Sequence, residues 1–165
     1  MCEGVLVDTI NKWIRTKTFS NGVSVTFTMR QSIVSSDYSF KLNPTNSSKN
    51  FKYFKNILNG KIFGNSYKRY GKELKMLVVL ENSVNNRLHY HTIIEKPDRL
   101  NVSQFDNLIR ECWNKTLFGY SYIDIQHPSS ISEEEGWVNY IMKRKTKEDF
   151  STSIDLENSS CLYLC

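Results

Sequence analysis

The chain has 165 residues, of which 39% are hydrophobic and 13% aromatic, so it can bury a core and is not disordered. A net charge of +5 is a weak indication of a polyanionic partner. The four cysteines form no C-x-x-C pair and no long apolar run is present, which argues against disulfide-rich, zinc-ribbon and membrane-spanning classes and predicts one cytoplasmic domain over residues 1–150, with an unassigned tail over 151–165.

Hydrophobic periodicity predicts the secondary structure in chain order. The predicted elements are a strand over 22–30, a polar loop over 32–48, an amphipathic helix over 49–58, strands over 74–81 and 88–95, a helix over 103–113, a strand over 119–126 and a helix from 132 to about 147. The polar segment between the second and third strands is short, so these two strands should form an antiparallel hairpin. Together the elements predict an α+β fold, in which helices pack on the faces of a central antiparallel sheet.

The third strand carries His89 and His91, two of the three histidines in the chain. Residues two apart on a strand point to the same face, so both imidazoles could reach one divalent cation. Glu81 ends the preceding strand, eight residues before His89, and the hairpin would bring it within cross-strand reach. A set of two histidines and one carboxylate with open positions suits Mg²⁺ or Mn²⁺. Glu95 is the alternative acid, since it shares the strand face of the histidines.

The last predicted helix contains the pattern Tyr140-x-x-Lys143. Residues three apart share a helix face, so the ammonium would lie beside the phenol. A phenol is a poor nucleophile at its ordinary pKa near 10, and a neighbouring positive charge favours the phenolate or offsets the charge of a phosphate. The pattern alone is common, and its position after the histidine strand gives it weight.

These patterns, in this order, resemble the HUH endonucleases, which include rolling-circle replication initiators (Rep proteins), relaxases and one class of transposases. Rep-type members carry a first strand motif, then an acid and His-hydrophobe-His on paired strands, then Y-x-x-K on a helix. The matching segments are 25–29 (VTFTM), Glu81 with 88–91 (LHYH), and 138–143 (VNYIMK), within a resemblance that spans roughly residues 23–147. Tyr90 is larger than the aliphatic residues frequent between the histidines, and no second tyrosine stands one turn from Tyr140.

The resemblance implies a single-tyrosine nuclease domain over residues 1–150, with a sheet of about five strands arranged as in RRM or ferredoxin-like folds. It implies that Mn²⁺ or Mg²⁺ is held by His89, His91 and Glu81, and that Tyr140, assisted by Lys143, nicks and rejoins single-stranded DNA at an origin or hairpin. The link formed is a 5′-phosphotyrosine, and the activity would initiate rolling-circle replication. A host or self-encoded helicase is a possible partner. The candidate phosphate contacts are Lys68, Arg69, Lys72, Lys143, Arg144, Lys145 and Lys147.

Three other interpretations fit parts of the sequence. A non-catalytic protein could bind single-stranded nucleic acid through exposed aromatic side chains and the basic excess. An HUH transposase would use the same residues. A cupin-type metal enzyme would use His89, His91 and Glu95, although it would require a nearly all-β barrel, whereas three helices are predicted here.

Overall fold

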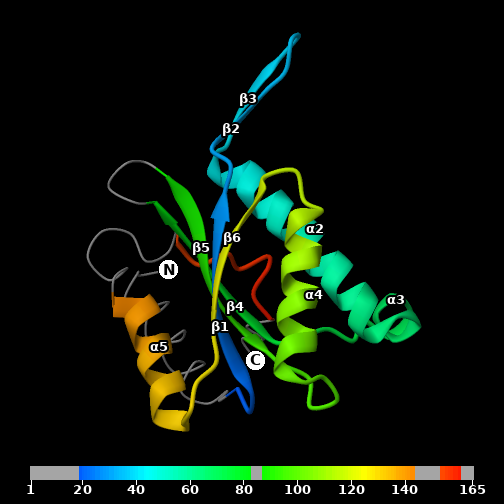
Figure 1. Ribbon diagram of the computed structural model, residues 1–165, viewed down its shortest axis with the longest axis vertical. Helices are drawn as coiled ribbons and strands as arrows, with labels where there is room; N and C mark the ends of the chain where they lie inside the picture. The colour runs from blue at the N-terminus through cyan, green and yellow to red at the C-terminus, as the bar shows by residue number, and fades with distance from the viewer. Residues whose placement is uncertain (1–18, 83–86, 144–152, 161–165) are drawn as a thin grey trace, which may run out of the picture.

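The computed structural model describes residues 19–82, 87–143 and 153–160. In these residues the fold is built around a four-stranded antiparallel sheet with the strand order β4-β5-β1-β6 (Figure 1). Its strands are β1 (Gly22–Met29), β4 (Met76–Asn82), β5 (Leu88–Glu95) and β6 (Gly119–Gln126). The predicted α+β class and the predicted hairpin of β4 and β5 are confirmed, and within the described residues this sheet has four strands where about five were predicted.

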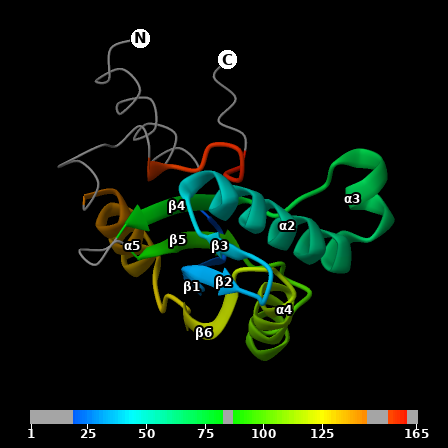
Figure 2. The ribbon, with the colours of Figure 1, turned by 90° about the horizontal axis from the view of Figure 1, so that it is seen from above.

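One face of the sheet is covered by helices α2 (Pro44–Phe63) and α4 (Val102–Asn114), as Figure 2 shows from above. Alternate side chains of β1 point to this face, and Phe27 is fully buried there. Its ring centroid lies 5.6 Å from that of Phe51 and 4.6 Å from that of Trp113. Burial of one such aromatic side chain contributes roughly 2–3 kcal/mol, so this layer is the main core of the domain.

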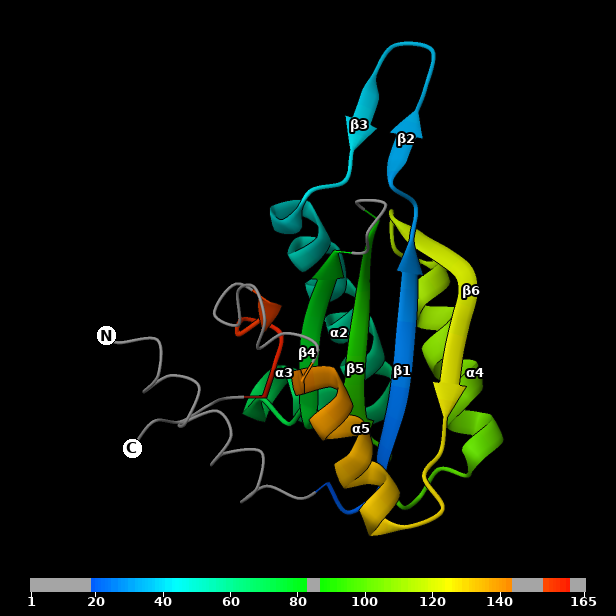
Figure 3. The ribbon, with the colours of Figure 1, turned by 90° about the vertical axis from the view of Figure 1, so that its left-hand side faces the viewer.

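Helix α5 (Ile131–Lys143) lies on the opposite face of the sheet and packs against β1 (Figure 3). Ile141 is buried in this helix, whereas Tyr140 is half exposed. The helix begins one residue before the predicted start at residue 132, and the Ser130 hydroxyl caps it by accepting a hydrogen bond from the backbone N–H of Glu133. The Glu133 carboxylate in turn accepts hydrogen bonds from Ser129, and this lowers the pKa of Glu133.

The predicted polar loop over 32–48 is wrong in part. It contains a small hairpin, β2 (Ser32–Val34) with β3 (Ser39–Lys41), that projects beyond one end of the central sheet (Figure 3). Helix α2 starts at Pro44, since the side chain of Asn43 caps it by accepting from the N–H of Asn46.

Helix α2 also extends beyond the predicted stop after residue 58 and ends at Gly64, where the backbone turns to a φ of 53°. Asn59 is buried inside the helix, and its side chain accepts a hydrogen bond from the N–H of Leu74. This tertiary contact offsets the turn preference of the Asn59-Gly60 pair. A short helix, α3 (Asn65–Tyr70), follows. None of the helices in the described ranges has both the length and the apolar character needed to cross a bilayer.

Residues 153–160 run along the outer edge of β4. Ile154 forms a bridge with Val79, the N–H of Asp155 donates to the carbonyl of Val78 at 2.9 Å, and the N–H of Ser160 donates to the carbonyl of Met76 at 2.8 Å. The sequence predicted no structure here. These hydrogen bonds satisfy backbone groups that an uncovered edge strand would leave unpaired.

Candidate metal centre

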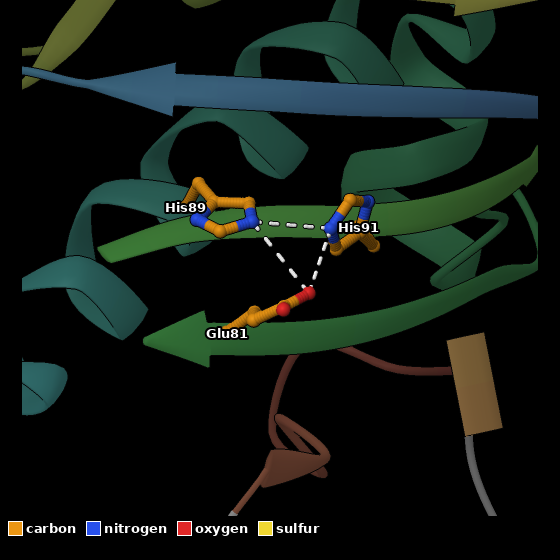
Figure 4. Close-up of side chains that lie close together, drawn as sticks. All are labelled: Glu81, His89 and His91. Atoms are coloured by element: carbon orange, nitrogen blue, oxygen red, sulfur yellow. Dashed lines mark hydrogen bonds and ion pairs between the residues drawn. The ribbon is translucent and has the colours of Figure 1, made fainter. Parts of the chain in front are cut away.

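The pairing register of β4 and β5 determines which side chains meet on the α5 side of the sheet. Glu81 lies directly opposite His89, and Val79 lies opposite His91. The side chains of Glu81, His89 and His91 point toward one another from these adjacent strands (Figure 4). The sheet register therefore brings together the three predicted metal ligands.

Three potential ligand atoms converge at this point. Nε2 of His89 lies 3.1 Å from Nε2 of His91, while Oε2 of Glu81 lies 2.8 Å from Nε2 of His91 and 3.6 Å from Nε2 of His89. Ligands bound at right angles to a cation at about 2.1 Å would be separated by about 3.0 Å. The spacing of the three atoms therefore fits one face of an octahedral divalent site, and the group could hold such a metal.

The other ring nitrogens of the two histidines have partners that hold the imidazoles in place. Nδ1 of His89 lies 3.3 Å from the carbonyl oxygen of Arg87, and Nδ1 of His91 lies 3.1 Å from the hydroxyl of Thr26 on β1. A proton on Nδ1 leaves the lone pair of Nε2 free for a metal, which is the usual arrangement around metal-bound histidines. Thr26 is the contact that the sequence did not predict as part of the site, although it lies in the first strand motif.

The charge balance of the cluster also favours a cation. With both Nδ1 atoms protonated, two nitrogen lone pairs and one carboxylate oxygen face the same small volume. Such a set repels itself unless a proton or a metal ion lies between the atoms. The side chains of Glu81, His89 and His91 retain 14%, 20% and 18% of their exposure, so a ligand from solvent can reach them.

Glu95 does not join this cluster. Its carboxylate accepts a hydrogen bond from the Ser20 hydroxyl at 2.9 Å and lies 3.5 Å from the ammonium of Lys75. Of the two predicted acids, Glu81 is therefore the one beside the histidines. The cupin-type interpretation is wrong, because it needs Glu95 at the site and a nearly all-β fold.

Tyr90, between the two histidines, faces the opposite side of the sheet. It is fully buried against Phe51, and its hydroxyl donates to the carboxylate of Asp155 at 3.1 Å. Burial raises the pKa of the Tyr90 phenol far above its ordinary value, and the nearby charge of Asp155 adds to the effect. Tyr90 is thus a core residue rather than a nucleophile, and its large ring fits the space above α2.

Tyr140 and Lys143 lie in the last turn of α5, the helix on the same sheet face as the three ligands. The Tyr140 side chain is 54% exposed. Among the predicted phosphate contacts, Lys68 and Arg69 lie on α3, next to α2 and therefore beyond the opposite face of the sheet. Three others, Arg144, Lys145 and Lys147, lie outside the described residues.

Comparison with known proteins gives the family. The family model for the replication-associated protein ORF2 matches residues 22–149, a segment that contains the three clustered side chains and Tyr140. The chain therefore belongs to this replication-associated protein family, which consists of rolling-circle replication initiators. This membership is consistent with the predicted resemblance to Rep-type HUH nucleases and implies DNA binding. No curated protein and no solved structure matches the chain.

Proposed function

We propose that this protein nicks and rejoins single-stranded DNA in a metal-dependent reaction that initiates rolling-circle-type replication. The observation that carries the proposal is the convergence of Glu81, His89 and His91 within 4.8 Å of one another, in a chain that belongs to a replication-initiator family. The helix that carries Tyr140 packs on the same face of the sheet. A metal site beside an exposed phenol is the equipment needed for phosphoryl transfer to a tyrosine.

In the proposed reaction, Glu81, His89 and His91 hold Mn²⁺ or Mg²⁺, which when bound would polarise the oxygens of the scissile phosphate. The Tyr140 oxygen attacks phosphorus, its proton leaves to solvent, and the bond from phosphorus to the 3′ oxygen breaks. That oxygen takes up a proton and becomes a free 3′-OH, while the 5′ end stays on the tyrosine. Attack by a 3′-OH reverses the step, so rejoining needs no external energy source.

Lys143 is proposed to act beside Tyr140. The two residues are three apart in one helical turn, and positions at this spacing lie on the same side of an α-helix. An ammonium there would favour the phenolate and offset the charge that develops on the phosphate during attack.

The proposal predicts a covalent adduct of protein and DNA. Single-stranded oligonucleotides that contain the cognate origin, incubated with the full chain and Mn²⁺, should give an SDS-resistant band that disappears with EDTA. The Tyr140→Phe variant should form no adduct, because the phenol oxygen is the attacking atom. Tyr53→Phe is a matched control, since Tyr53 is also 54% exposed but lies on α2, on the other side of the sheet.

Wild-type adduct formation that persists in Tyr140→Phe would contradict the assignment of the nucleophile. DNA binding without any adduct in the wild-type protein would contradict the enzyme and favour a binding protein. Failure of both Tyr140→Phe and Tyr53→Phe would indicate that a general loss of structure, rather than loss of one hydroxyl, explains the result, and circular dichroism would detect it.

A further inference from the structure

The edge strand β6 contains a bulge beside the metal centre. Phe27 of β1 pairs with Ile123, but Met29, two residues on, pairs with Gly119. Three residues of β6, Tyr120 to Tyr122, therefore lie opposite the single residue Thr28 of β1. Bulges of this kind occur at sheet edges and next to active sites, where they redirect a side chain.

The packing of β6 on α4 fixes the end of the bulge. Gly119 lies so close to the carbonyl oxygen of Trp113 that a Cβ atom at this position would clash with the backbone. The bulge cannot shift along the strand without breaking this contact. It leaves Tyr120 50% exposed and Tyr122 70% exposed, although both are large aromatic side chains within a sheet.

The hydrogen bonds of Thr28 place Tyr122 close to the metal ligands. Thr28 pairs with His89 on one side, and its hydroxyl donates to the carbonyl oxygen of Tyr122 on the other. Tyr122 is thus two strands away from His89, or about 10 Å across the sheet. Ile123 points into the core beneath the sheet, so its neighbour Tyr122 is directed to the face that carries the histidines.

The local charge indicates which part of a DNA strand this surface would contact. Asp124 is exposed next to this position and pairs with Thr26, and its carboxylate accepts a hydrogen bond from the side chain of Gln126. A carboxylate repels a phosphate but not a base. An exposed phenol ring stacks with any base, since every base has a π-face.

We infer that Tyr122, presented by the β6 bulge, stacks on a base of the single-stranded DNA close to the phosphate held at the metal centre. The inference rests on the proposed function for the identity of the substrate. It adds a positioning residue: stacking fixes the path of the strand across β1, so that one phosphate meets Glu81, His89 and His91. Tyr120, in the same bulge, provides a second ring for the neighbouring base.

Binding of a fluorescein-labelled single-stranded oligonucleotide tests this role without any cleavage, using the full chain with Tyr140→Phe. Adding Tyr122→Ala should raise the Kd about 10-fold, while Tyr122→Phe, which keeps the ring, should change it less than about twofold. The dependence of log Kd on log salt should keep its slope, because no phosphate contact is removed. The matched control is Tyr70→Ala, because Tyr70 is 80% exposed but lies on α3.

An oligonucleotide of abasic residues should bind the Tyr122→Ala protein and its parent equally, since it has no base to stack. Equal affinity of the two proteins for the normal oligonucleotide would overturn the inference, as would a similar loss in Tyr122→Phe. The result is separate from the adduct assay: an adduct with no effect of Tyr122→Ala refutes only the stacking role. A stacking effect without any adduct refutes only the nuclease.

Discussion

Replacing His91 by Ala is expected to lower the affinity for Mn²⁺ by at least about 100-fold and to abolish formation of the DNA adduct. His91 makes the shortest contact of the cluster, 2.8 Å to Glu81, and its ring is oriented by Thr26. Without its Nε2, two ligands remain and the face of the octahedron is incomplete. Isothermal titration calorimetry with Mn²⁺ measures the first effect, and the adduct assay measures the second.

His127 provides the control for this experiment. It is the third histidine of the chain, and its ring pairs with Asp106 at 2.8 Å instead of with the cluster. The His127→Ala variant should bind Mn²⁺ and form the adduct as the wild-type protein does. Unchanged metal affinity in His91→Ala, or an equal loss in both variants, would show that the cluster is not the metal site.

Truncation after Phe150 should destabilise the domain by about 3–5 kcal/mol. It removes the buried side chain of Ile154, worth roughly 2–3 kcal/mol, and leaves the buried hydroxyl of Tyr90 without its acceptor Asp155, at a cost of roughly 1–3 kcal/mol. For a chain of this size the melting temperature should fall by about 10 °C. Differential scanning calorimetry of the full and truncated chains gives the value directly.

Two point variants separate the parts of this effect. Asp155→Ala should lose a substantial fraction of the stability, because Asp155 also accepts from the side chain of Asn158 at 2.7 Å. Glu157→Ala should have little effect, since Glu157 and its partner Lys52 are both exposed. A truncated chain as stable as the full chain would instead support the predicted domain limit at residue 150, with a dispensable tail.

The sheet and the ligand pair could be predicted from the sequence because their signals are local. Alternation of apolar and polar residues over 22–30 and 119–126 indicated the strands, and the spacing of His89 and His91 indicated a shared face. The choice between Glu81 and Glu95 could not be predicted. It depends on the register of the β4–β5 hairpin, which a shift of one residue would reverse.

The features that the sequence did not predict depend on contacts distant in the chain. The edge cover by residues 153–160 consists of hydrogen bonds to β4, more than 70 residues away, and has no periodic pattern of its own. The β6 bulge follows from the close approach of Gly119 to Trp113. The role of Thr26 needed the pairing of β1 with β5. The start of α2, by contrast, was signalled by Asn43-Pro44, a capping residue followed by proline.

The most direct test of the metal centre is the anomalous scattering of crystals of the full chain grown or soaked with Mn²⁺. The structure predicts one strong peak about 2.1–2.2 Å from Nε2 of His89, Nε2 of His91 and a carboxylate oxygen of Glu81, with further positions open to water or phosphate. A peak located at other side chains, or no peak at this cluster under conditions in which calorimetry shows Mn²⁺ bound, would contradict the account.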